Sequence, residues 1–362
     1  MPPLAEILSV AEGLSHEAAW RDLARRAAEP NPFAEIAFLG PALKHLARQT
    51  ALRIALVWSE PDRRTLLAAL VIERPGFVLS FARVWRHEQA ALGAAMFDRE
   101  AVTPALLSLT TALRSAFPFA AGLLLSRTAR DGALAKAARA LDGFAETSVL
   151  SRAAYNFGGE AEPSAKRRKE WARLERRLAE RGRLETRVRV DYDAFERFLA
   201  LEAKGWKGTR RTALIDAPAR AAFAREMAAR FRLDGRLRVH ELALDDAPIA
   251  SGLELRAGRR AFFWKISYDE AFAPYSPGVL LSRALARRLA QEGEIELIDS
   301  CAAENHPMID RVWPGRLEFA DFALPVGASP LYPTFLAWER AAPRLRQRLK
   351  PFVLPLLGRK RS

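Results

Sequence analysis

Ala273-Pro274-Tyr275-Ser276-Pro277-Gly278 is the turn at the centre of the stretch that decides the fold, which runs from Arg236 to Trp313. Before the turn, apolar runs separated by Asp, Pro and Gly predict a meander of three strands: 237–244, 249–257 and 260–267. After it, apolar residues at helical spacing predict a helix, 279–291, and a last strand, 295–298, which ends at Asp299-Ser300. This order predicts that the last strand lies parallel to the third, beneath a right-handed crossover.

The turn opens the predicted helix in a way that suits an anionic ligand. Pro277 lacks an N–H and presets φ for a helix start, and Gly278 has no side chain to hold a ligand away from the backbone. The first N–H groups of a helix are unpaired, so a diphosphate there gains about 1 kcal/mol from the helix dipole alone. A helix that simply starts after a loop explains the same residues, and both interpretations stand at this point.

Length and composition describe a chain that can bury a large core. It has 362 residues and 50% hydrophobic residues, which favours two domains. Most of the net charge of +14 falls in residues 166–189 and 340–361, so the main body is not a polycation designed for nucleic acid. The single cysteine, Cys301, excludes an internal disulfide. With no signal-peptide pattern and no apolar run of about 18 residues, we expect a cytoplasmic protein.

The first half of the chain is predicted to repeat the order of the second at an offset of about 185 residues. Its predicted elements are a helix (34–49), a strand hairpin (52–58 and 66–73), a third strand (77–81), a helix (103–117) and a strand (120–126). Ahead of its crossover helix stands Phe97-Asp98-Arg99-Glu100, whose carboxylates would repel a phosphate. We therefore expect an anionic cofactor to bind in the second half.

Two segments between the halves offer surfaces to ligands. After the linker 158–163, Ser164 caps an Arg-rich helix, 166–181, whose arginines form either a solvated face or a binding surface. Further on, Gly205-Trp206-Lys207-Gly208 holds a ring and a cation in a loop just past a helix end. Loops placed in this way often contact ligands, although a Trp that plugs a seam between domains explains the same pattern.

The tail, residues 331–362, combines basic and apolar residues. A peripheral contact with an anionic membrane and a helix docked on the body are both consistent with it. A liposome-pelleting comparison of the full chain with residues 1–330 separates the two interpretations.

With these features in view, the chain resembles the tandem-GNAT acyltransferases of the BioF2-like or CelD-like group, which are relatives of the Fem peptidyltransferases. The segments that carry the resemblance are the Arg-rich helix 166–181, the run Leu201-Glu202-Ala203-Lys204-Gly205-Trp206-Lys207-Gly208, Thr212-Ala213, Tyr275-Ser276-Pro277-Gly278, the strand ending at Asp299, and Arg311-Val312-Trp313. Over residues 1–157 it rests on element order and on Asn31-Pro32-Phe33. The chain departs from the pattern at Arg211 and Arg311, where the group tends to have Gly and Lys.

The resemblance implies an α/β fold with mixed sheets and two GNAT-like lobes with a cleft between them. Residues 1–157 would be a degenerate, acceptor-side lobe and residues 164–330 the lobe that binds acetyl-CoA or another acyl-CoA. The residues implied to contact the cofactor are Ile266 and Ser267 along the pantetheine arm, Tyr275, Ser276, Gly278 and Val279 at the phosphates, and Arg283 as a charge partner. Trp206 and Lys207 are the predicted substrate-binding pair.

Transfer to an amine needs a base, a donor for the oxyanion and an acid for the thiolate. The candidate bases are Asp299, Glu254 and His306, and a water relay needs none of them. Asp299 is the first choice, because ligands gather at the carboxyl ends of strands beside a gap in a sheet, although a cap on the turn 300–303 explains the same residue equally well. Lys265 stands among apolar residues and needs a partner, for which Asp299 and Glu254 are available. Tyr268 is the candidate acid.

Other chemistries have little support in the sequence. There is no Gly-x-Ser-x-Gly, no P-loop and no Gly-x-Gly-x-x-Gly, and the five histidines are too far apart to predict a metal site. The sequence therefore predicts an acyl-CoA-dependent acyltransferase acting on an amine or hydroxyl of a small molecule or envelope precursor. Two alternatives remain: a Fem-like transferase that takes its group from aminoacyl-tRNA, with the basic helix on phosphates, and a catalytically silent accessory protein of exopolysaccharide or cellulose synthesis.

Overall fold

The computed structural model of the chain describes residues 2–59, 63–76, 80–159, 163–327 and 329–341. The chain forms two compact units. Unit 2 joins Pro30–Arg48 to Ser151–Leu317, and unit 1 comprises the residues before Pro30, Gln49–Leu150 and the described residues from Glu318 on. The units therefore differ from the predicted lobes in three segments, because 30–48 and 151–157 pack with the second half and the described residues from Glu318 on pack with the first.

Unit 1 is a mixed sheet with helices, in the strand order β1-β2-β3-β4-β6-β13 and with β5 paired to β3. Its strands are β1 (Leu4–Leu8), β2 (Leu52–Trp58), β3 (Leu66–Glu73), β4 (Phe81–Val84), β5 (Ala95–Phe97), β6 (Gly122–Ala129), the first part of β7 (Ala145–Asn156) and most of β13 (Gly315–Pro325). Its helices are α1 (Val10–Leu14), α2 (Glu17–Arg26), α4 (Val102–Ala116) and α5 (Ala133–Arg139), with a 3-10 turn, η2 (Gln49–Ala51). β4 and β6 are parallel, with α4 between them in sequence.

Unit 2 repeats this plan with the strand order β7-β12-β11-β10-β9-β8. Its further strands are β8 (Leu184–Arg189), β9 (Leu237–Leu244), β10 (Ala247–Ala257), β11 (Arg260–Tyr268) and β12 (Leu297–Asp299). Its helices are α3 (Ile36–His45), α6 (Ala165–Ala179), α7 (Tyr192–Lys204), α8 (Trp206–Thr209), α9 (Pro218–Leu233), α10 (Pro277–Glu292) and α11 (Ile309–Val312), with the 3-10 turns η1 (Pro32–Ala34), η3 (Leu214–Asp216) and η4 (Glu270–Tyr275). β11 and β12 are parallel, as the sequence predicts.

The mixed α/β architecture is confirmed, and the predicted order of elements recurs in both units. The third strand of unit 1 is β4 rather than 77–81, of which 77–79 lie outside the described residues. The strands β2, β3 and β4, the helix α4 and the strand β6 of unit 1 correspond in order to β9, β10, β11, α10 and β12 of unit 2. In unit 1 the residue ahead of the crossover helix is the buried Asp98, which pairs with Arg26 and accepts the N–H of Glu100 at 3.0 Å. A buried carboxylate thus precedes the crossover helix of unit 1, whereas unit 2 has its Ser-Pro-Gly turn at the helix start itself.

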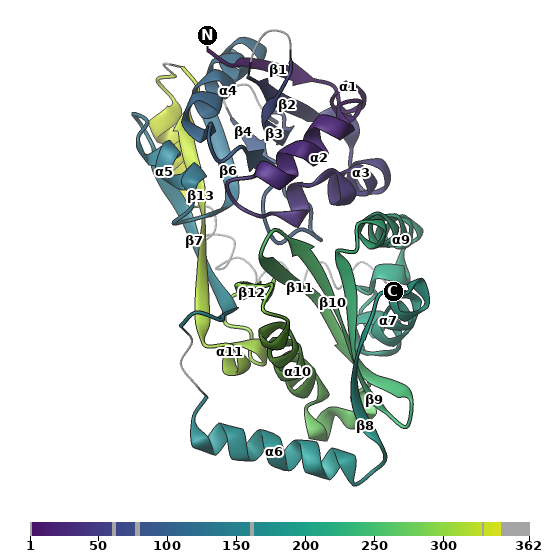
Figure 1. The fold of residues 1–362 in the computed structure, drawn as a ribbon. Coiled ribbons are helices and arrows are strands. Elements are labelled where there is room, and N and C mark those ends of the chain that lie inside the picture. The colour runs from purple at the N-terminus through teal and green to yellow at the C-terminus, as the bar shows by residue number, and fades with distance from the viewer. Residues whose placement is uncertain (1, 60–62, 77–79, 160–162, 328, 342–362) are drawn as a thin grey trace, which may run out of the picture. The chain divides into compact units, whose positions relative to one another are not determined.

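The central sheet of unit 2 is covered on both faces. Figure 1 shows α10 on one side of β9, β10 and β11, and α7 and α9 on the other. β10 is consequently buried over nearly its whole length, and α10 contributes Leu281, Leu285 and Leu289 to the core. The segment 30–48 belongs to this core because Phe38 packs edge-to-face on Phe223, with ring centroids 5.2 Å apart.

Three strands of unit 1 were not predicted, and the tail differs from its prediction. The sequence did not predict β1, β5 or β13, each of which pairs within the sheet of unit 1. The described beginning of the tail is docked on unit 1, since Phe335 and Leu336 pack against a buried cluster that includes Phe81 and Tyr332. The remaining tail residues named in the membrane hypothesis, 342–362, lie outside the described residues. In the described part of the chain, no helix combines the length and the apolar content that crossing a bilayer requires.

Candidate active site

A pocket in unit 2 begins where two parallel strands separate. β11 pairs with β12 from Arg260 opposite Leu297 to Phe262 opposite Asp299, where β12 ends. The partner strand β10 places Leu253 opposite Lys265 but Glu254 opposite Phe263, so Trp264 is an extra residue on β11. Such a bulge bends its strand and increases the twist. β11 therefore continues to Tyr268 without β12 beside it.

The resulting cavity has a volume of about 530 Å³. Its walls come from β11, from the segment 300–309 that follows β12, from the beginning of α10, and from the end of α7 with the loop that leads into α8. Ten of the fourteen candidate site residues line it: Trp206, Lys207, Lys265, Ile266, Ser267, Tyr268, Ser276, Gly278, Val279 and His306. The other four, Glu254, Tyr275, Arg283 and Asp299, lie elsewhere in unit 2.

The Ser-Pro-Gly turn forms one end of the cavity. Ser276 adopts a left-handed conformation, with φ 51° and ψ 54°, and its side chain makes no capping hydrogen bond to α10 in the described structure. Across the pocket, the Sδ atom of Met308 is so close to Gly278 that a Cβ at that position would lie 2.9 Å from it. Gly278 is itself buried, but it lines the pocket together with Ser276 and Val279, and its missing side chain leaves room for Met308 beside the start of α10.

A buried ion pair holds the predicted substrate lysine. Lys207 donates from Nζ to Glu202 Oε1 at 2.9 Å and to the backbone carbonyl of Ile266 at 3.0 Å. Glu202 is only 1% exposed, and its second oxygen accepts the N–H of Leu214 at 2.8 Å. Lys207 therefore connects α7 to the part of β11 that borders the pocket. Glu202 was not among the predicted site residues.

The loop around Lys207 is also tied to the turn before α10. Lys204 pairs with Asp269 at 2.6 Å, and the N–H of Trp206 donates to Glu270 at 2.6 Å. Trp206 itself is 47% exposed at the pocket, with the guanidinium of Arg210 5.2 Å from its ring centroid. The loop and the turn consequently form one connected wall, and Trp206 offers a flat surface to a ligand.

Asp299, the first-choice base, is engaged in a structural ion pair. Its Oδ2 lies 2.5 Å from Arg152 Nη2, and its Oδ1 accepts the N–H of Cys301 at 2.9 Å. Both charged side chains are 2% exposed. Asp299 thus anchors the segment that follows β12 and does not itself line the pocket.

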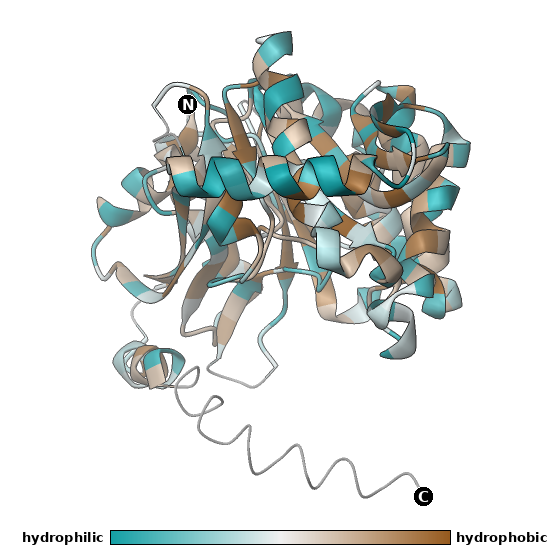
Figure 2. Ribbon diagram, turned by 90° about the horizontal axis from the view of Figure 1, so that it is seen from below, coloured by the Kyte–Doolittle hydropathy of each residue, from teal (hydrophilic) through white to brown (hydrophobic). Residues whose placement is uncertain are grey.

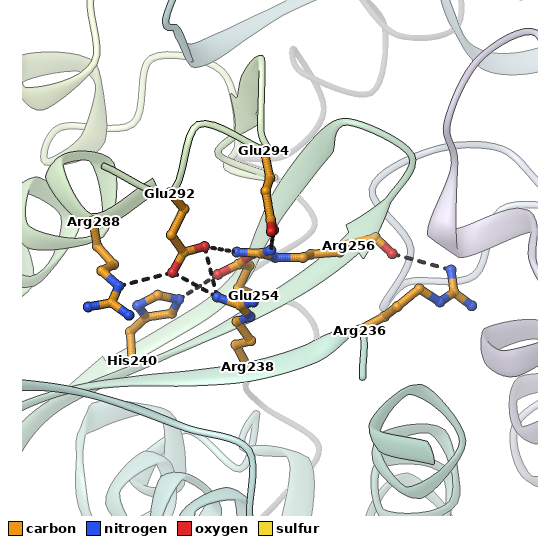
Figure 3. A network of polar contacts seen from close by, with 8 residues as sticks. All are labelled: Arg236, Arg238, His240, Glu254, Arg256, Arg288, Glu292 and Glu294. Carbon is orange, nitrogen blue, oxygen red and sulfur yellow. Dashed lines mark hydrogen bonds and ion pairs between the residues drawn. The ribbon is translucent and has the colours of Figure 1, made fainter. Parts of the chain in front are cut away.

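Glu254, another candidate base, belongs to a separate network on β9, β10 and the end of α10 (Figure 3). It is fully buried, lies 2.5 Å from His240 Nε2 and also contacts Arg256. Burial opposes its ionisation, but His240 and Arg256 lower the pKa of Glu254 below its ordinary value. The network continues through Glu292, Glu294, Arg238 and Arg288. Its contacts fasten the end of α10 to the sheet.

Tyr275 and Arg283 contact the basic helix α6 rather than the pocket. The ring of Tyr275 lies 5.5 Å from the guanidinium of Arg177, and its hydroxyl accepts a hydrogen bond from Arg181 at 3.2 Å. Arg283 stacks on Trp171 at 4.6 Å, and burial together with Arg287 lowers the pKa of Arg283. The outer face of α6 is hydrophilic, as the helix that crosses the front of Figure 2 shows. Arginines of α6 therefore stand beside the residue that precedes Ser276.

The remaining titratable residues that line the pocket lie on β11 and on the segment 300–309. On β11, Lys265 has its Nζ 5.1 Å from the ring centroid of Trp264. Tyr268 lies at the Gly278 end of the cavity, about 13 Å along the strand from the bulge. On the opposite side, burial and Asp299 raise the pKa of the Cys301 thiol well above its ordinary value. His306 turns its Nδ1 toward the N–H groups of Met308 and Ile309, each at 3.4 Å.

Comparison with known proteins agrees with this geometry. Residues 165–306 match the family model described as an acetyltransferase (GNAT) domain. No curated protein sequence matches the chain. The match spans α6 through His306 and therefore contains most of the residues that line the pocket. It supports an acyltransferase of the GNAT type. Among the described residues, no group of three or more His, Cys, Asp or Glu side chains could hold a metal ion.

Solved structures share the fold over most of the chain. The structure of FemX has a TM-score of 0.57 at 11% identity, covering 91% of this chain and all of FemX. A conserved protein of unknown function from Bacteroides thetaiotaomicron has a TM-score of 0.56 at 11% identity, covering 86% and 97%. A domain assigned as the C-terminal part of a lysylphosphatidylglycerol synthetase from Agrobacterium fabrum has a TM-score of 0.56 at 12% identity, covering 91% and 96%. At these identities the likeness shows the fold alone.

Proposed function

We propose that unit 2 binds an acyl-CoA in the pocket between β11 and the segment 300–309, and that the protein transfers the acyl group to an amine or hydroxyl of a small molecule or envelope precursor. The observation that carries this proposal is the meeting of two features in one cavity. One is the stretch of β11 after the bulge at Trp264, which has no β12 beside it, and the other is the start of α10, which lines the same cavity at Ser276, Gly278 and Val279.

In this proposal the two ends of the cavity have different tasks. The diphosphate lies at the Ser276–Val279 turn, where the dipole of α10 stabilises negative charge. Arg177 and Arg181, which hold Tyr275, add positive charge beside that end. The pantetheine arm follows β11 past Ser267 and Ile266, and the thioester reaches Lys265 near the bulge.

The chemistry is the direct attack of a neutral amine on the thioester. A C–N bond forms, the carbonyl becomes an oxyanion, and the C–S bond then breaks to release the thiolate of CoA, which takes up a proton. Asp299 and Glu254 are committed to buried cations outside the pocket, so the proton of the attacking amine passes to water in the open cavity. Lys207 and Trp206 orient the acceptor.

A Fem-like transfer from aminoacyl-tRNA is the second candidate, and one observation favours it. The exposed basic face of α6 stands next to the phosphate turn and is large enough to contact a polyanion. The shared fold with FemX is compatible with this candidate. A third candidate, a silent accessory protein of polysaccharide synthesis, would need no ligand in the pocket.

Calorimetric titration with CoA, acetyl-CoA and aminoacyl-tRNA separates these candidates. We expect heat with both CoA species, and we expect Gly278→Glu to abolish that binding without unfolding the protein, because it fills and charges the turn. Gly76→Glu is the matched control, since a side chain there meets no atom within 4 Å. No heat with either CoA species would refute the proposal, and salt-sensitive tRNA binding would favour the second candidate.

A further inference from the structure

We propose that Lys207 is a positioning residue that prepares one edge of β11 to bind the carbonyl groups of the acyl donor. This free edge runs from Ile266 to Tyr268, on the side of β11 where β12 has ended. The inference rests on the proposed acyl transfer and gives Lys207 a role toward the donor in addition to its contact with the acceptor. Its ammonium occupies the carbonyl oxygen of Ile266 at 3.0 Å, so a ligand finds N–H groups on this edge and not that carbonyl.

The pairing of β11 with β10 shows which backbone groups face the gap. Just after β11, the N–H of Asp269 donates to the carbonyl of Ile249 on β10 at 2.8 Å. In an antiparallel pair, the backbone groups of alternate residues point toward the neighbouring strand. The groups of Ser267 therefore also point toward β10. Those of Ile266 and Tyr268 point away from β10, to the side where β12 no longer accompanies β11.

Both N–H groups on the free edge are available to a ligand. Neither the N–H of Ile266 nor that of Tyr268 has a hydrogen-bond partner in the part of the chain that the structure describes. Both residues are half-buried, and both line the cavity. A backbone N–H in such a place is stabilised by an acceptor, so a ligand that brings carbonyl oxygens gains hydrogen bonds along β11.

The carbonyl groups of the free edge, in contrast, lie against the loop that contains Lys207. The ammonium of Lys207 is held on the carbonyl of Ile266 by its second hydrogen bond, which joins Nζ to Glu202 Oε1 at 2.9 Å. The carbonyl oxygen of Tyr268 lies near the same loop, 3.8 Å from the position of a Cβ on Gly205. An ammonium has three N–H donors, so one remains for the acceptor. The free edge thus offers two donors, while its carbonyl at Ile266 is already occupied.

This arrangement determines how the acyl donor lies on β11. The carbonyl oxygens of its amide-containing arm accept from the N–H groups of Ile266 and Tyr268, and its own N–H groups turn toward the segment 300–309. Without Lys207, the carbonyl of Ile266 would take up water or another donor, which the ligand would have to displace. Lys207 therefore strengthens binding by keeping the edge in its bound arrangement before the ligand arrives.

Substitution in a background without the buried carboxylate separates this role from stability. Glu202→Gln keeps Lys207, whereas Glu202→Gln/Lys207→Met also removes the hydrogen bond to Ile266. By calorimetry, we expect the Kd for CoA to be about tenfold higher in the double variant than in Glu202→Gln. Glu202→Gln/Lys207→Arg restores a cation with several N–H donors and should regain most of the affinity. Lys136→Met, at an exposed lysine of unit 1, is the control and should bind as wild type does. Equal affinities in Glu202→Gln and its Met derivative would overturn the proposal.

Amide hydrogen exchange followed by NMR tests the free edge before any ligand is added. The N–H groups of Ile266 and Tyr268 should exchange much faster than those of Ser267 and Asp269, which point to β10, and they should slow when CoA is added. Slow exchange of all four in the free protein would overturn the proposal. If the alternation is found but CoA neither gives heat nor slows exchange in wild type, the proposed acyl transfer has failed, and the role of Lys207 toward the donor fails with it. Failure of that role alone would leave CoA binding in wild type intact and equally strong in the double variant.

Discussion

The guanidinium of Arg152 lies 2.5 Å from the carboxylate of Asp299, and both side chains are almost completely buried, at 2% exposure. Asp299 also accepts the backbone N–H of Cys301, so the pair fixes the point at which the chain leaves β12 and enters the wall of the pocket. The residue that the sequence favoured as a base is thus the anchor of the segment that carries Cys301 and His306.

Asp299→Ala should therefore reduce stability more than it reduces ligand binding. Removing one partner leaves a buried charge without compensation, which costs about 3–5 kcal/mol. We expect that loss in the free energy of unfolding measured by urea denaturation, and a nearly unchanged Kd for CoA in the fraction that remains folded. If the variant is instead stable but has lost its activity, Asp299 contacts the reacting atoms.

Lys207 and Glu202 should behave as a coupled pair. Lys207→Met leaves the buried carboxylate of Glu202 without its cation, so the variant should lose stability. The double variant Glu202→Gln/Lys207→Met removes both charges and should be more stable than Lys207→Met alone. Lys204→Met, at a lysine whose side chain is 68% exposed, is the control and should have a small effect. If thermal unfolding shows that the double variant is no more stable than Lys207→Met, the coupling is contradicted.

The two glycines that flank Trp206 and Lys207 should tolerate alanine very differently. A Cβ at Gly208 would lie 1.8 Å from the backbone carbonyl oxygen of Ala203, whereas the nearest atom to a Cβ at Gly205 is 3.7 Å away. Backbone cannot yield as a flexible side chain can, so Gly208→Ala should cost about 1–3 kcal/mol and displace the loop. Gly205→Ala should be near neutral. The melting temperatures of the two variants, measured side by side, check this, and equal values would show that the loop relaxes freely.

Acid should weaken the attachment of α3 to α9. Burial opposes ionisation of Glu226, but hydrogen bonds from Lys44, His45 and Arg230 outweigh it and lower its pKa from 4.5 to about 2. A carboxylate with a lowered folded-state pKa stabilises the protein fully above its unfolded pKa, and this contribution is lost as the pH falls from 4.5 toward 2.

The stability difference between wild type and Glu226→Gln should therefore shrink over that acidic range and stay constant from pH 6 to 8. Urea denaturation at several pH values measures it. Glu100→Gln, an exposed glutamate of unit 1, provides the same change in charge as a control. A difference that does not vary with pH would show that the ion pairs of Glu226 do not stabilise the fold.

Many secondary-structure elements of unit 2 could be predicted from the local sequence pattern. The strands 237–244 and 260–267, the crossover helix and the turn at Gly278 were predicted because apolar periodicity and Pro-Gly chemistry act over a few residues. The importance of Glu202 could have been predicted from its spacing. It continues the buried stripe of α7 formed by Phe195, Phe198 and Leu199, and a buried carboxylate needs a partner. The strands β1 and β13 escaped prediction because their pairing partners are distant in sequence.

By itself, the sequence determined the order of strands and helices, the repeated plan of the two halves and the half that has a ligand-accessible turn, since each depends on residues close together in the chain. The tertiary structure decided which charged groups are available to a ligand. Asp299 is paired with Arg152, and Glu254 with His240 and Arg256, so neither carboxylate is available to a ligand. Lys207, Lys265 and His306, in contrast, line the pocket. The pairs formed by Arg152 and His240 join residues on neighbouring strands that are distant in sequence, so they depend on how the strands pair in the sheet, which no local pattern encodes.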